Sequence, residues 1–112
     1  MPAFRQGDVV RLPFPYTDRN TRQHRPALVI SNGPIGDGDA LLWVAMITSA
    51  QNRPWPGDHA IEAFGQAGLP IPSVVRAAKI TTIEARDAEG VGRLEEALVS
   101  KVMATIMGLL GR

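Results

Sequence analysis

The stretch RPALVIS, residues 25–31, decides the fold together with a second stretch, ALLWVAMITS, residues 40–49. Each is an almost unbroken apolar run of strand length, which is typical of strands that are buried on both faces. Pro26 lies at the beginning of the first run, where a missing N–H does the sheet no harm. Arg25, which is always charged, precedes this run directly. It therefore either ends in solvent or is held at the rim of the core to meet an anion.

Outward from these runs, the sequence continues as short β-like segments divided by glycine and proline. GDVVRLPF at residues 7–14 predicts an earlier strand, and HAIEAF at residues 59–64 alternates as a half-buried strand does. SVVRAAKITTIE at residues 73–84 predicts one or two more strands, and the turn-rich segment at residues 32–40 predicts a hairpin connection. Frequent short strands at this spacing indicate a small barrel or sandwich.

The last part of the sequence has a helical period, from about Val91 to Leu110. Apolar residues recur there in steps of four from Leu94 onward, with a second series one position later. Glu95 and Glu96 fall in the first turn of the predicted helix, where the helix dipole favours negative charge. The apolar arc is wider than packing on one small barrel requires. The helix is therefore either deeply buried or partly paired with a second subunit.

Length and composition predict one soluble domain, residues 1–112, in a reducing cytoplasm. Cysteine is absent, which excludes disulfides, a thiol nucleophile and a cysteine zinc site. We see no signal peptide and no apolar run of membrane-spanning length. The net charge is only +1, but residues 1–30 hold five arginines against two aspartates, an excess of +3. That excess would suit phosphates, or it belongs to a solvated loop.

No motif predicts a metal or another cofactor. The segment GPIGDGD lacks the lysine and hydroxyl residue of a phosphate-binding loop, and it lacks the twelfth-position glutamate of a calcium loop. His24 and His59 are far apart in the sequence, and neither has a pair of ligands nearby. Any hydrolysis by this chain is therefore expected to proceed without a metal.

Several segments form a combination that is much more specific than any one of them. In order, these are GDVVRLPFPYTD, HRPALVIS, VAMITS, AGLPIPSVVRAAKITTIE and the Gly92-Arg93-Leu94 start of the predicted helix. Over nearly the whole chain this combination resembles the MazF/PemK family of bacterial toxins from type II toxin–antitoxin pairs. The resemblance implies a mainly β fold, an SH3-like small β-barrel of the CcdB/MazF kind with a C-terminal α-helix, usually a homodimer. It also implies an mRNA interferase, which cleaves single-stranded RNA sequence-specifically without metal, and an antitoxin partner that covers the RNA groove.

In that family, the arginine that opens the Arg-Pro-Ala-Leu strand and the threonine of Ile-Thr-Ser carry the chemistry. The matching positions here are Arg25 and Thr48. RNA supplies its own nucleophile, the 2′-OH beside the phosphate, and the products are a 2′,3′-cyclic phosphate and a 5′-OH. Arg25 suits charge stabilisation, because its planar fork can hold two phosphate oxygens. A hydroxyl at Thr48 can donate to a phosphate oxygen or orient the 2′-OH, although a β-branched residue is also simply favoured in strands.

Other side chains are candidates for holding RNA in the same groove. They are Arg22, His24, Ser49, Gln51, Arg53, Trp55 and Arg76. Trp55 can stack on a base or pin its own loop. His24 is disfavoured as a general base, because neighbours on a strand point to opposite faces and Arg25 is expected to face the groove. Some relatives place an acid two positions after the arginine that matches Arg76, where this chain has Ala78. A mechanism that relies on such a pair is therefore not expected here.

Two other functions stay open on the sequence. A gyrase-poisoning toxin of the CcdB type would keep the fold and act through protein contacts. A non-catalytic SH3-like module would bind a peptide along its groove and leave RNA whole. The segments RPALVIS and ITS favour the nuclease over both.

Overall fold

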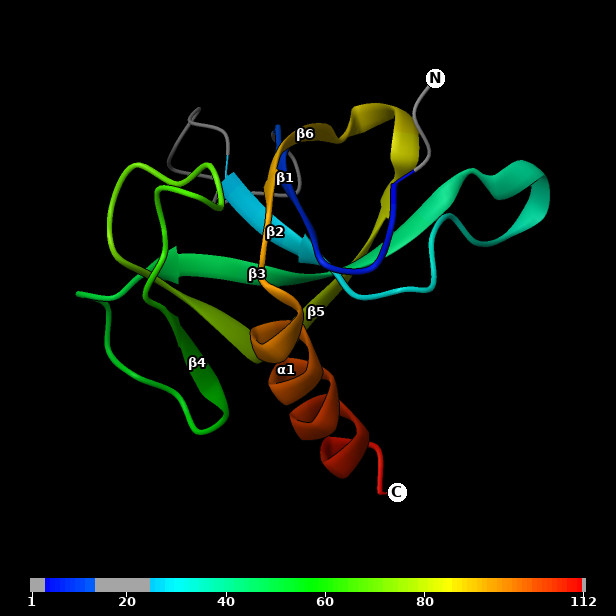
Figure 1. The fold of residues 1–112 in the computed structure, drawn as a ribbon. Coiled ribbons are helices and arrows are strands. Elements are labelled where there is room, and N and C mark those ends of the chain that lie inside the picture. Colours follow the sequence, from blue (N-terminus) through cyan, green and yellow to red (C-terminus); the bar gives the residue numbers. More distant parts are fainter. Residues whose placement is uncertain (1–3, 14–24, 112) are drawn as a thin grey trace.

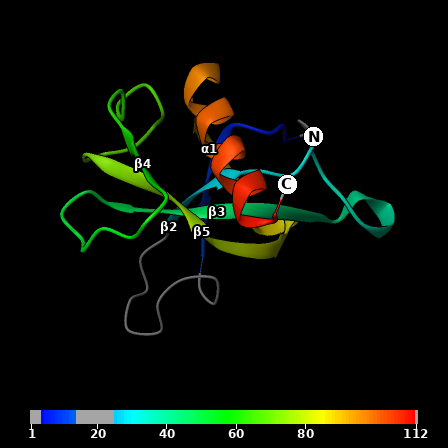
Figure 2. The same cartoon turned by 90° about the horizontal axis from the view of Figure 1, so that it is seen from below.

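A computed structural model describes residues 4–13 and 25–111 of the chain. Its main feature is one antiparallel sheet, curled into a half-barrel and crossed on one face by a C-terminal helix (Figures 1 and 2). The strands are β1 (Asp8–Leu12), β2 (Arg25–Val29), β3 (Leu41–Ser49), β4 (Asp58–Ile61), β5 (Ser73–Glu84) and β6 (Glu89–Arg93), and the helix is α1 (Glu96–Leu109). Their order across the sheet is β4-β5-β3-β2-β1-β6. The predicted mainly β, SH3-like fold with a C-terminal helix is confirmed.

The central strands of the sheet are buried on both faces over most of their length, and this explains the nearly unbroken apolar runs. In β3, Ala45 and Ile47 belong to the cluster that α1 completes with Val102. The alternate residues Val44 and Met46 belong to a second cluster on the other face. None of these five side chains is more than 6% exposed. A strand packed on both faces has no place for the polar alternation of a half-exposed strand.

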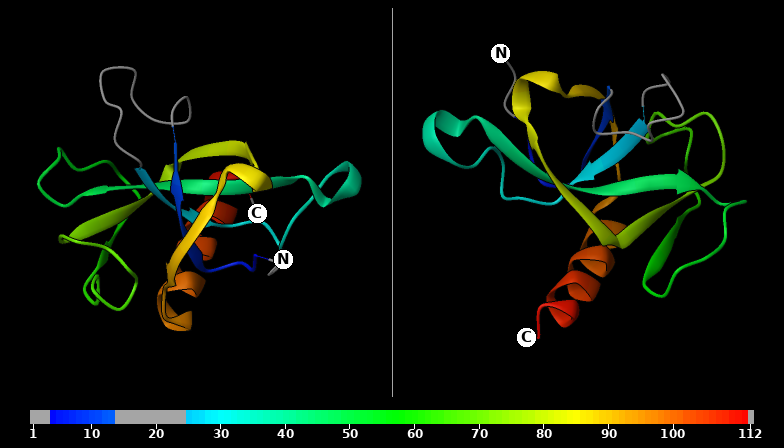
Figure 3. Two further views of the ribbon diagram at one scale, coloured as in Figure 1. Left: turned by 90° about the horizontal axis from the view of Figure 1, so that it is seen from above. Right: turned by 180° about the vertical axis from the view of Figure 1, so that it is seen from behind.

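Strand β5 is one continuous bent strand rather than two. Its pairing with β3 passes from Ala45 opposite Ile80 to Ile47 opposite Val75, so β5 has additional residues at this point. Such bulges bend the bulged strand and increase its twist. The first part of β5 pairs with β4 and the second part runs along the beginning of β3, as the long bent ribbon in Figure 3 shows. The bend thus produces the curl of the sheet.

Two glycines bring the segment after β4 into backbone contact with β6. A Cβ atom on Gly68 would lie 2.1 Å from the carbonyl oxygen of Val91, and one on Gly92 would lie 2.2 Å from that of Ala67. Gly68 also has φ +83°, a conformation that other residues rarely adopt. This close approach fixes the residues that follow Gly68 against β6.

The helix begins later than its periodicity predicted. We expected it from about Val91, but the residues up to Arg93 belong to β6 and pair with β1, and α1 begins at Glu96. The apolar spacing could not reveal this pairing, because Gly92 is selected by its backbone contact with Ala67. The helical interpretation of residues 91–93 was therefore wrong.

The wide apolar arc of α1 is only partly covered in the single chain. Val99, Val102 and Ile106 are buried against the sheet, whereas Leu109 and Leu110 are 61% and 69% exposed. The helix is therefore buried along its middle and bare at its C-terminal end. Within residues 4–13 and 25–111, no helix combines the length and apolar character needed to cross a membrane.

Candidate functional site

A groove of about 710 Å³ lies where β2 begins and β3 ends. It is lined by residues from separate parts of the chain: Arg11, Arg25, Pro26, Ile47, Thr48, Ser49, Asn52, Gly68, Leu69, Pro70, Ile71, Ser73 and Val91. Both residues singled out for chemistry, Arg25 and Thr48, are among them. The lining combines polar side chains with an apolar segment, residues 69–71, which forms an apolar wall.

Strands β2 and β3 pair as far as Ala27 and Met46, and their register aligns Arg25 with Thr48. Strand β2 pairs with β3 so that Ala27 is opposite Met46 and Leu28 is opposite Ala45. Continued by two residues toward the groove, this register puts Arg25 opposite Thr48. Residues opposite each other on antiparallel strands point to the same side, with Cβ atoms roughly 5 Å apart. A guanidinium and a hydroxyl so placed can contact one group of the size of a phosphate.

Arg25 is the groove cation that has no acidic partner in the described part of the chain. Its side chain is partly buried, and none of the ion pairs found there includes it. The arginines that do form such pairs are Arg11, Arg76, Arg86 and Arg93. An arginine at the rim of an apolar core, with no carboxylate among the described residues to neutralise it, is available to an anion that enters the groove.

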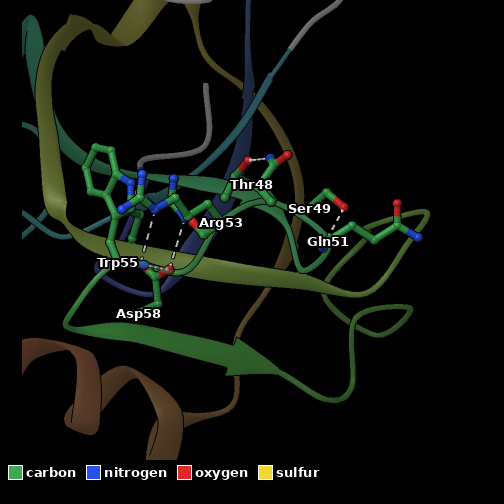
Figure 4. Close-up of polar contacts among 8 residues, drawn as sticks. Thr48, Ser49, Gln51, Arg53, Trp55 and Asp58 are labelled. Atoms are coloured by element: carbon green, nitrogen blue, oxygen red, sulfur yellow. Dashed lines mark hydrogen bonds and ion pairs between the residues drawn. The ribbon is translucent and has the colours of Figure 1, made fainter.

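The hydroxyl of Thr48 has a partner of its own. The side-chain amide of Asn52 donates a hydrogen bond to Thr48 Oγ1, and Figure 4 shows this bond at the end of β3. A turn brings Asn52 back, since its backbone N–H donates to the carbonyl of Ser49 at 3.1 Å. The Ser49 hydroxyl accepts a hydrogen bond from the backbone of Gln51 at 3.2 Å. The end of β3 is thus a small, ordered set of hydroxyl and amide groups.

Arg76 does not line the groove. Its Nε and Nη2 donate to the two carboxylate oxygens of Asp58 at 3.1 and 3.0 Å, and Nη2 also donates to the carbonyl of Arg53 at 2.8 Å. The guanidinium lies over the ring of Trp55, 4.3 Å from its centroid. The Arg76 and Asp58 side chains are each only 10% exposed. This Arg76–Asp58–Trp55 cluster (Figure 4) fastens the loop at residues 50–57 to the sheet.

The environment of Asp58 keeps it charged. Burial on its own raises the pKa of this carboxyl. Hydrogen bonds from Arg76 and from the backbone of Trp55, with the nearby charges of Arg76 and His59, more than offset the burial. The pKa of Asp58 therefore lies below the ordinary value of 3.8.

The structure divides the predicted RNA-binding residues into groups. Ser49 lines the groove, whereas Gln51 and Arg53 lie on the loop after β3 and outside the lining. Trp55 and Arg76 are joined in the cluster with Asp58. Arg22 and His24 lie outside the described residues.

Groove residues that we did not expect from the sequence are Arg11 and the wall at residues 69–71. Arg11 could have been identified from the sequence, because a charged residue interrupts the apolar run of β1 there. Arg25 similarly stands directly before the apolar run of β2. The hydrogen bond between Asn52 and Thr48 could not be predicted, because it depends on the shape of a turn.

His59 links strand β4 to helix α1. His59 on β4 lies 2.8 Å from the hydroxyl of Thr105 on α1, measured from Nε2 to Oγ1, and so ties the edge strand to the helix. Over residues 4–13 and 25–111, no three His, Cys, Asp or Glu side chains come together as metal ligands would.

Comparison with known proteins gives a family and a fold. Residues 5–110 match the family described as PemK-like, MazF-like toxin of type II toxin-antitoxin system. A MazE–MazF structure from Deinococcus radiodurans has a TM-score of 0.77 at 22% identity, covering 99% of this chain and 98% of that one. An endoribonuclease in complex with its cognate antitoxin from a mycobacterial species has 0.73 at 21%, covering 99% and 96%. The Mycobacterium tuberculosis toxin MazF-mt6 has 0.66 at 19%, covering 93% and 96%. No curated protein matches significantly.

Proposed function

Because the chain belongs to the PemK-like, MazF-like toxin family of type II toxin–antitoxin systems, we propose that it is a metal-independent, sequence-specific endoribonuclease that acts on single-stranded RNA. The observation that supports this best is the groove that Arg25, without an acidic partner among the described residues, lines together with Thr48. A protein of similar fold is described as an endoribonuclease.

In the proposed reaction, the 2′-OH of the substrate attacks the adjacent phosphorus atom. The bond from phosphorus to the 5′ oxygen breaks, which leaves a 2′,3′-cyclic phosphate and a 5′-OH end. Extra negative charge builds up on the phosphate oxygens in the transition state. Arg25 would hold two of these oxygens with its fork, and such preorganised stabilisation of developing charge is commonly the largest contribution to catalysis.

Thr48 would act as a hydrogen-bond donor to the same phosphate. A hydroxyl has one proton to donate and two lone pairs that accept. Asn52 occupies one lone pair of Thr48 Oγ1, so the hydroxyl proton stays free to turn into the groove. Asn52 would then be a positioning residue that acts through Thr48.

The apolar wall suits the sugar and base of the nucleotide beside the cut. Leu69, Pro70 and Ile71 line the groove, and Ile71 is 48% exposed. One face of Trp55 lies against Arg76 instead, outside this lining. Aliphatic contact rather than stacking on Trp55 is therefore expected at this nucleotide.

The proposed function also implies two protein partners and a cellular location. A cognate antitoxin would inhibit by covering the groove, in keeping with the antitoxin complexes among the similar structures. A second copy of the chain would cover the bare end of α1, where Leu109 and Leu110 are exposed. The chain would form a single domain. It would act on messenger RNA, in the cytoplasm.

Purified protein is expected to cut a long mixed-sequence RNA in the presence of EDTA. Mapping of 5′-hydroxyl ends should find a few recurring sequences, and the opposite ends should be cyclic phosphates. Cleavage that depends on added divalent metal would refute the proposed mechanism. Inhibition of gyrase without any RNA cleavage would favour the CcdB-type alternative, and neither activity would favour the non-catalytic module.

Replacing Asn52 with alanine is expected to slow cleavage roughly five- to ten-fold, the effect of one hydrogen bond of about 1 kcal/mol. The measurement is the single-turnover rate at saturating RNA, with the affinity measured in parallel. Since Asn52 acts through Thr48, the change should have no further effect in a Thr48→Val background. Losses that multiply in the double variant would show that Asn52 contacts RNA directly instead.

A further inference from the structure

A second arginine enters the groove from the strand next to Arg25. Arg11 on β1 lines the groove, and its register partner on β2 is Pro26, the immediate neighbour of Arg25. With strands about 4.8 Å apart and a rise of about 3.4 Å per residue, Arg11 and Arg25 have Cα atoms roughly 6 Å apart. Because Pro26 and Arg25 are neighbours on one strand, the side chains of Arg11 and Arg25 leave the sheet on opposite faces. Both nevertheless line the groove, which lies at the ends of their strands, so both can contact phosphates of one RNA strand that crosses this end of the sheet.

Arg11 is held by an acid on the edge strand. Glu89 of β6 is its register partner on the other side of β1, and Arg11 Nε donates to Glu89 Oε1 at 2.9 Å. Nη2 of Arg11 contacts the same oxygen. The two side chains are 49% and 60% exposed. Glu89 itself does not line the groove.

The solvent exposure of the Arg11–Glu89 ion pair determines how easily it opens. Ion pairs between solvent-exposed side chains are worth about 0–1 kcal/mol, so they open at little cost. The Arg76–Asp58 pair, with each side chain 10% exposed, is of the opposite kind. Arg11 is therefore a groove cation with a weakly bound neutralising partner, whereas Arg76 is committed to the fold.

We propose that Arg11 is a second phosphate-binding site of the groove, for the phosphodiester next to the scissile one, and that Glu89 weakens this site by neutralising Arg11. The inference rests on the proposed RNA substrate. A bound phosphate and the Glu89 carboxylate compete for one guanidinium charge. RNA binding loosens the pair, and Glu89 keeps the affinity of the groove for RNA below its maximum.

The test is the affinity for an uncleavable RNA. The probe is a single-stranded oligonucleotide that contains a mapped cut sequence and carries 2′-deoxyribose at the nucleotide that supplies the nucleophile. Glu89→Gln is expected to bind this probe roughly two- to five-fold more tightly than the unchanged protein, the range that an exposed ion pair allows. Arg11→Gln is expected to bind it more weakly, with the slope of log affinity against log salt reduced by about 0.7, as for one lost contact to single-stranded RNA.

Glu84→Gln is the matched control. It makes the same change in net charge at an exposed pair with Arg86, and Glu84 does not line the groove. Its affinity should equal that of the unchanged protein. The gain from Glu89→Gln should also disappear in an Arg11→Gln background, because Glu89 acts through Arg11.

Three results would overturn the inference while leaving the proposed nuclease intact. They are equal affinity of Glu89→Gln and the unchanged protein, equal gains from Glu89→Gln and Glu84→Gln, and a gain that persists without Arg11. Failure of the unchanged protein to cut RNA at all would overturn the proposed function, and this inference with it.

Discussion

Arg25→Ala is expected to lower the rate of RNA cleavage by a factor on the order of 10²–10³, the usual effect of removing one group that stabilises transition-state charge. The loss should fall mainly on the single-turnover rate at saturating RNA, since the charge that Arg25 meets is largest in the transition state. Cleavage is measured on the RNA used for mapping, and the affinity on the uncleavable probe.

Arg25→Lys separates charge from geometry. Lysine keeps the positive charge but has no planar fork, so an intermediate rate is expected. Both variants should stay folded, because Arg25 is partly exposed and forms no ion pair within residues 4–13 and 25–111. Their unfolding free energies should lie within about 1 kcal/mol of the unchanged protein. Cleavage by Arg25→Ala at the normal rate would exclude the proposed role.

Asp58→Asn is expected to reduce the free energy of unfolding by about 3 kcal/mol, because it leaves the buried Arg76 guanidinium without its carboxylate. Urea denaturation at neutral pH measures the change. Glu89→Gln is the control, since it breaks an exposed pair and should cost less than about 1 kcal/mol. A loss as small as the control's would mean that the cluster does not hold the loop at residues 50–57.

The stability supplied by Asp58 also depends on pH, in a direction that its pKa determines. The folded-state pKa is below the ordinary value of 3.8, so the contribution is fully present above that value. It is lost as pH falls through the folded pKa, because protonation then favours the unfolded chain. Asp58→Asn should lack this part of the acid destabilisation and leave the rest unchanged.

The strands at the groove were predictable, because burial on both faces leaves a direct mark on the sequence. β2 begins at Arg25 and β3 ends at Ser49, as the apolar runs RPALVIS and ALLWVAMITS indicated. Side chains at the ends of such runs must leave the core. Arg25 and Thr48 lie at the ends of these runs and could therefore project into one groove, but their choice as site residues came from the family resemblance. Their alignment follows when the register of β2 against β3 is continued.

Arg76 and Trp55 were not predictable in the same way. Nothing in the spacing of Asp58 and Arg76 shows that strands β4 and β5 place them opposite each other. In sequence, Arg76 looks like any basic residue that could meet RNA, and only its bidentate contact with a buried carboxylate assigns it to the fold. The β6 strand was missed for a related reason, since a pairing with β1 leaves no local pattern.

The backbone contact between Gly68 and Gly92 links the apolar wall to the last strand that the ribosome delivers. Arg25 and Thr48 emerge much earlier, but residues 69–71 of the groove lack the support of β6 until residues 89–93 have left the exit tunnel and paired with β1. A half-translated toxin would therefore carry its reactive pair without a place to seat a nucleotide. On the proposed function, we expect the message being read to be spared by its own nascent product until residues 89–93 have left the exit tunnel and paired.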